Sequence, residues 1–153
     1  MAKRHTRNRL VATESAISAS SVDKSDADLL DGVVTASVLV ARSDGRIAPA
    51  EREMLVDFLD RKGLLSVFTR AEILDAFDRR LSQIEEHSGV EAAVSSLKRF
   101  AGRSLVRVVI DAARHVAVAD GHLQSREIHL LCLIHIALVA PSSRNHYCDG
   151  VKI

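Results

Sequence analysis

The stretch VTASVLVARSDGRIAPAEREMLVDFL, residues 34–59, decides the fold, because its pattern returns 76 residues later in the chain. The second copy is VVIDAARHVAVADGHLQSREIHLLCLI, residues 108–134. Each copy contains an apolar helical pattern, then Asp-Gly, then Ile or Leu, then Glu at the start of a second helical pattern. We therefore predict two helical hairpins, each with one apolar face, that cover each other about an approximate twofold axis.

The two copies agree at the positions that shape a hairpin. Eight residues are identical: Val33/Val109, Ala36/Ala112, Val40/Val116, Ala41/Ala117, Asp44/Asp120, Gly45/Gly121, Glu51/Glu127 and Leu55/Leu131. The turn residues repeat along with the apolar ones, so the sequence predicts two equivalent bends.

Apolar spacing predicts six helices and an all-α bundle. The first two are expected at about 26–43 and from Pro49 to Gly63. The third follows a Thr69–Glu72 capping box, and the fourth runs from a Ser88–Glu91 capping box to Gly102. The last two are expected at 104–119 and from 125 to about 139. The third and fourth would join the two hairpins. The fifth and sixth are apolar on most sides, so we expect them to form the buried centre.

Length and composition bound the organisation of the chain. The 153 residues suit one domain, which we place at 25–141, after a flexible, basic, Ser-rich arm at 1–24 and before a tail at 142–153. A hydrophobic content of 47% argues against a disordered chain. The longest apolar run, Leu130–Ala140, is too short to span a membrane, and no signal peptide is recognisable. We therefore expect a cytoplasmic protein.

The repeated Asp-Gly…Glu unit has a purely structural interpretation. Gly45 and Gly121 can adopt the left-handed conformation that ends a helix, and the preceding aspartates can form Asx turns. Ile47 and Leu123 would anchor each turn on the core. The glutamates would face the unpaired N–H groups of the next helix.

The same spacing also has a metal-binding interpretation. Asp, Gly, Ile or Leu, and Glu stand at positions 5, 6, 8 and 12 of an EF-hand loop, but positions 1 and 3 lack oxygen ligands in both copies. Neither loop is therefore an EF-hand. Two carboxylates near one turn could still bind a hard divalent cation with a dissociation constant on the order of 10⁻⁴–10⁻³ M. Both interpretations stay open at this stage, and a tighter site would need the two loops, or Asp57 or Asp111, to converge.

The two quoted segments resemble the TerB-like family of tellurite resistance proteins, which also occurs at the N-terminus of a membrane-anchored DnaJ-like co-chaperone. The resemblance implies an all-helical fold, no enzymatic activity, and a divalent-metal site of the calcium or magnesium type. Carried over by position, the metal ligands are Asp44, Glu51, Asp120 and Glu127. It also implies a role in tellurite and related stress responses, with protein partners in membrane-associated assemblies.

Other functions find less support in the sequence. No nucleophile, HExxH or phosphate-loop motif is present, so we expect no catalysis and no small-molecule substrate. The spacing of His115, His122 and His129 is a poor match to a transition-metal site. A net charge of +1 gives no general case for nucleic-acid binding, although the basic arm leaves a nucleic-acid or other polyanion-binding protein as the alternative function. A homodimer is compatible with the sequence.

Overall fold

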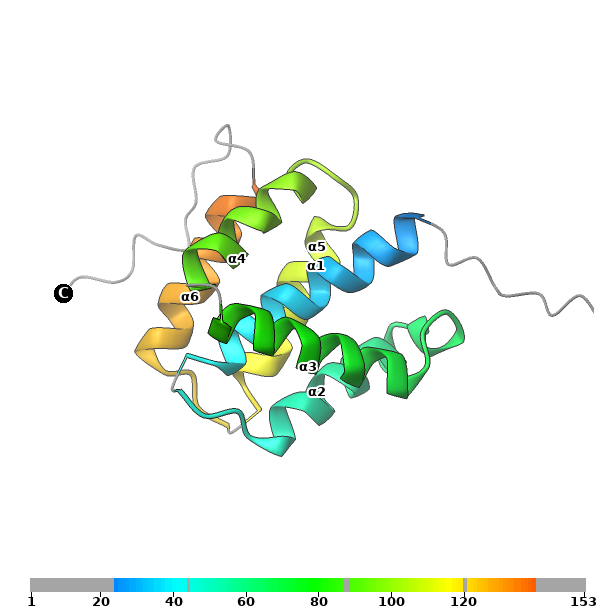
Figure 1. Ribbon diagram of the computed structural model, residues 1–153, viewed down its shortest axis with the longest axis horizontal. Coiled ribbons are helices and arrows are strands. Elements are labelled where there is room, and N and C mark those ends of the chain that lie inside the picture. The colour runs from blue at the N-terminus through cyan, green and yellow to red at the C-terminus, as the bar shows by residue number, and fades with distance from the viewer. Residues whose placement is uncertain (1–23, 44, 87–88, 120, 140–153) are drawn as a thin grey trace, which may run out of the picture.

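A computed structural model of the protein describes residues 24–43, 45–86, 89–119 and 121–139. Within these ranges the chain forms six α-helices, two short 3₁₀ helices and no strand (Figure 1). The elements are α1 (Lys24–Ala41), α2 (Pro49–Arg61), η1 (Leu64–Ser66), α3 (Arg70–Glu86), α4 (Gly89–Leu97), η2 (Lys98–Phe100), α5 (Val106–Ala117) and α6 (Ser125–Leu138). The predicted all-α bundle of six helices is confirmed. The expected arm, except for Lys24, and the whole expected tail lie outside the described residues.

Helices α1 and α5, the first helices of the two hairpins, form the centre of the bundle. Every residue of α1 from Gly32 to Ala41 is buried, and α1 packs against α3, α4, α5 and α6. Small residues allow the close approach of the two central helices: a Cβ atom at Gly32 would lie 3.1 Å from Cγ2 of Val109 on α5. The equivalent alanines Ala36 and Ala112 are both fully buried.

The expectation that the fifth and sixth helices form the buried centre was wrong for the sixth. Five of the 14 residues of α6 are buried and Ile136 is 58% exposed, whereas ten consecutive residues of α1 are buried. The apolar surface of α6 extends past the part that meets the core, so its composition overstated its burial. Helix α1 takes the central place because its small residues let four helices approach it from different sides.

Helices α3 and α4 connect the hairpins, as predicted, and α3 lies over α1 and α2 (Figure 1). The Thr69–Glu72 capping box is confirmed, because Glu72 Oε2 accepts hydrogen bonds from the Thr69 N–H at 2.7 Å and from the Thr69 hydroxyl at 2.8 Å. These bonds lower the pKa of the Glu72 carboxyl. Ser88, the cap expected for α4, lies outside the described residues. None of the described helices is long and apolar enough to cross a membrane.

Candidate functional site

The two bends that follow α1 and α5 have the same backbone shape. Gly45 and Gly121 have φ angles of 82° and 84°, a left-handed conformation that favours glycine. The Gly45 N–H donates to the Arg42 carbonyl at 3.0 Å, and the Gly121 N–H donates to the Val118 carbonyl at 3.0 Å. The repeat in sequence is therefore a repeat in structure, down to the hydrogen bonds that end each helix.

The glutamate of each bend caps the helix that follows it. Glu51 Oε2 accepts a hydrogen bond from the Ala48 N–H at 2.6 Å, and Glu127 Oε2 accepts one from the Gln124 N–H at 2.6 Å. Neither Ala48 nor Gln124 caps its helix with its own side chain, so each glutamate supplies a carboxylate at the positive end of its helix. The structural interpretation of the two glutamates is confirmed.

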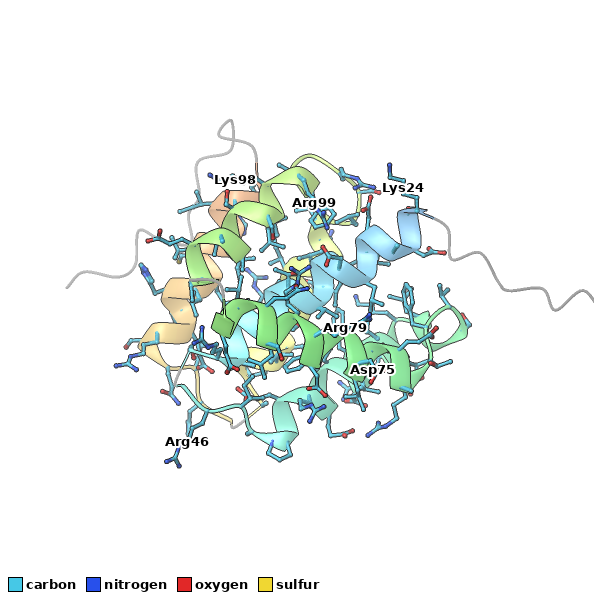
Figure 2. The ribbon with its side chains drawn as sticks, in the orientation of Figure 1. Lys24, Arg46, Asp75, Arg79, Lys98 and Arg99 are labelled. Carbon is cyan, nitrogen blue, oxygen red and sulfur yellow. The ribbon has the colours of Figure 1, made fainter. Side chains whose placement is uncertain are left out.

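The fold brings the two bends together. Glu51 and Glu127 both line one cavity of about 80 Å³, which lies between the C-terminal end of α5 and the starts of α2 and α6. In Figure 1 the connection from α1 to α2 and the connection from α5 to α6 run side by side. Glu127 is 5% exposed and Glu51 is partly exposed, whereas Arg46 of the first bend extends away from the helices (Figure 2). The sequence predicted the two bends but offered no signal for this shared cavity.

Asp44 and Asp120, the other two predicted ligands, lie outside the described residues. Within the part of the chain that the structure describes, no three His, Cys, Asp or Glu side chains form a group able to hold a metal ion. A cation site at the paired bends therefore depends on the aspartates as well as the glutamates.

The additional carboxylates that the sequence offered do not reach the shared cavity. Asp57 forms an ion pair with Arg61 one turn along α2, and its Oδ2 lies 4.0 Å from Nε2 of His115. Oδ2 of Asp111 lies 4.0 Å from Nζ of Lys62. These groups belong to the contact between α2 and α5, so they do not extend the candidate site.

The apolar anchors of the two bends differ. Ile47 packs against the core as predicted, but Leu123 is 45% exposed, so the expectation that it anchors the second turn on the core was wrong. Leu123 instead lines a surface groove between α5 and α6. The two hairpins are thus equivalent in the backbone of their bends but not in the burial of the apolar residue that follows each glycine.

A family model described as tellurite resistance protein TerB matches residues 30–144, which is more than half of the chain and includes both hairpins. No curated protein and no solved structure matches the chain.

Proposed function

The chain belongs to the TerB family, and from this membership we propose that it is a non-catalytic helical module whose paired bends bind a divalent cation. The module would act through protein partners, including a membrane-associated assembly, in the response to tellurite and related stresses. One observation carries the cation part of the proposal: the two glutamates at equivalent positions of the repeat line the same cavity.

The chemistry of the side chains fits a hard cation. Carboxylate oxygens are the ligands that Ca²⁺ and Mg²⁺ prefer. Asp44, Glu51, Asp120 and Glu127 would hold the ion, with backbone carbonyls and water completing the shell. One oxygen of each glutamate also accepts a hydrogen bond from a backbone N–H. This bond orients the carboxylate, but it also weakens the attraction of that oxygen for a cation. We therefore expect a dissociation constant on the order of 10⁻⁴–10⁻³ M.

A melting experiment tests the cation site. The full chain is heated with Ca²⁺, Mg²⁺, Mn²⁺ or Zn²⁺ and in sodium chloride of matched ionic strength. A cation at about 100 times its dissociation constant should stabilise the folded state by about 2.7 kcal/mol, read as a rise in Tm. The Asp44→Asn/Asp120→Asn and Glu51→Gln/Glu127→Gln variants should lose that rise. The glutamine side chain can still accept the capping hydrogen bond, so the second variant removes charge and keeps the fold.

A matched control is Glu91→Gln, because Glu91 is an exposed glutamate in the first turn of α4. This variant should keep the full cation-dependent rise in Tm. The cation proposal is wrong if no ion raises the Tm of the wild-type chain, or if the rise is the same in the variants at the bends and in the wild type.

A further inference from the structure

A groove lies between α1 and α3, where the two helices pack against each other (Figure 1). Its volume of about 370 Å³ is in the range of sites that hold small molecules. Each helix lines it with residues three or four positions apart, which share one helical face. These residues are Ala27, Leu30, Asp31 and Val34 on α1 and Glu72, Ala76, Arg79, Arg80 and Gln83 on α3, with Phe68 just before α3.

The α1–α3 groove has an apolar floor. Val34 and Phe68 belong to the core and are each 2% exposed, whereas Leu30 and Ala76 are half-buried and still reach solvent. A ligand that covered Leu30 and Ala76 would remove apolar surface from water, which favours binding. The floor therefore suits the apolar part of a ligand.

Both acidic side chains of the groove are already engaged within the protein. Asp31 accepts hydrogen bonds from Arg80 on α3 and from Arg99 on η2. Glu72 accepts the capping hydrogen bonds of Thr69. Because two guanidinium groups share the one carboxylate of Asp31, this ion-pair cluster has one more positive than negative charge.

Arg79 adds a positive charge beside that cluster. Its one hydrogen bond within the described residues runs from Nε to the Asp75 carbonyl at 3.3 Å, so its two terminal nitrogens meet no protein acceptor there. Gln83 lies one turn later on the same face, and its amide forms no hydrogen bond within the same part of the chain. Glu72 lies two turns before Arg79, about 10 Å along the helix axis. This end of the groove therefore suits an anion.

The shape of the donors favours a carboxylate as that anion. The planar guanidinium group of an arginine presents parallel N–H groups that match the two oxygens of a carboxylate. An amide N–H of Gln83 could donate to the same carboxylate, since residues four apart on a helix are neighbours.

We propose that the α1–α3 groove binds a small amphiphile that has a carboxylate head group and an apolar body, of which a medium-chain fatty acid is the simplest form. The carboxylate contacts Arg79 and Gln83, and the apolar body covers Leu30 and Ala76. The ligand is bound and not converted, so the site needs no catalysis. This inference goes beyond the proposed function and does not depend on the cation site.

An NMR titration of the full chain tests the groove with three probes of equal chain length: octanoate, 1-octanol and octyltrimethylammonium. All are kept below the concentration at which they form micelles. A ligand of this size should have a Kd on the order of 10⁻³ M. We expect octanoate to bind about threefold to fivefold more tightly than 1-octanol, the range for an exposed ion pair, and the cationic probe to bind most weakly. Amide shifts should change along residues 27–34 and 72–83 and stay constant along α5 and α6.

Substitutions at the head-group end separate charge from apolar contact. Arg79→Gln should remove the preference for octanoate over 1-octanol and leave the Kd of 1-octanol unchanged. Gln83→Glu places a carboxylate beside Arg79 and should also weaken octanoate. The matched control is Arg107→Gln, because Arg107 is an exposed arginine of α5 that does not line the groove. This variant should bind octanoate like the wild-type chain.

A substitution in the floor tests the apolar contact. Ala76→Leu fills part of the groove and should weaken octanoate and 1-octanol alike, by about threefold or more. Ala71→Leu makes the same size change at an exposed position of α3 that does not line the groove, so it should leave both affinities unchanged. The Tm of each variant checks that the fold is intact.

Several outcomes overturn the proposal. They are equal binding of octanoate and 1-octanol, a preference for octanoate that persists in Arg79→Gln, and shifts that lie outside α1 and α3. Binding to vesicles of phosphatidylglycerol without binding of octanoate would also overturn it, because the ligand would then be a membrane surface. A cation-dependent rise in Tm beside any of these results would leave the cation site standing, and octanoate binding without that rise would leave the groove standing.

Discussion

His115 shows how one side chain ties the hairpins together. It lies on α5 with its side chain 21% exposed, and its ring centroid is 5.6 Å from that of Phe58 on α2. Burial lowers the pKa of its imidazole, the nearby Arg61 lowers it further, and Asp57 partly opposes both effects. The first hairpin has Leu39 at the equivalent position, which is 1% exposed. The site therefore suits a neutral side chain.

The lowered pKa of His115 predicts a pH dependence of stability. Between the pKa of the folded chain and the ordinary value of 6.5, the unfolded chain binds more protons at this residue. The free energy of unfolding should therefore fall as pH drops below about 6.5. In the His115→Leu variant, which copies the first hairpin, this part of the pH dependence should disappear. Urea titrations of both chains at several pH values between 5 and 7.5 measure the difference.

The exposed His129 on α6 provides the control for this prediction. His129→Leu should leave the slope of stability against pH close to that of the wild-type chain. A slope that survives in His115→Leu would show that other groups carry the acid sensitivity.

At the scale of helices, the contact between α1 and α5 depends on small side chains. Ala36 on α1 and its counterpart Ala112 on α5 are both fully buried, and they belong to the same core as Val109. An enlarged side chain there has to displace neighbours that are already close-packed. Ala36→Leu should therefore lower the free energy of unfolding by about 1–3 kcal/mol.

Chemical denaturation with a control of the same size change checks this expectation. Ala71→Leu adds the same side-chain atoms to an exposed position near the start of α3. It should change stability by less than about 0.5 kcal/mol. Similar losses in both variants would mean that leucine harms the helices for a reason other than packing at the centre.

The helices also show where the sequence was sufficient. Local features were predictable because each depends on a few neighbouring residues: the Pro49 start of α2, the Thr69–Glu72 capping box and the left-handed glycines of both bends. Burial of whole helices was not, because apolar content alone does not show how many partners a helix meets. Helix α6 is as apolar as a core helix, yet the packing of α4 and η2 against it leaves Ile136 58% exposed.

The candidate site likewise has a part that local sequence predicts and a part that depends on packing. The repeat identified Glu51 and Glu127 and their helix-capping positions, since capping follows from local sequence. Their meeting in one cavity depends on how the hairpins pack, and no pattern within either hairpin contains that information. The exposure of Leu123 likewise depends on how the helices pack around the second bend and not on its local sequence.

At the scale of the whole molecule, the arrangement of the helices predicts which part of the fold opens last. The second half of α1 is buried on every side by α3, α4, α5 and α6, whereas α6 keeps one face exposed. Amides that open only when the whole domain unfolds exchange most slowly with solvent. We therefore expect the slowest hydrogen exchange in residues 33–41 of α1 and 109–117 of α5.

Native-state hydrogen exchange followed by NMR distinguishes a centre made of α1 and α5 from the centre made of α5 and α6 that apolar content predicted. If α1 and α5 form the last unit to open, their slowest amides should share one free energy of opening, equal to the global free energy of unfolding. Amides of α6 should then exchange through smaller openings. Ala36→Leu should lower the protection of α1 and α5 by equal amounts, because amides that exchange only through global unfolding share one free energy of opening. If α6 instead exchanges as slowly as α5 while α1 exchanges faster, the centre of stability lies within the second hairpin. In that case the burial of α1 would not determine how the domain holds together.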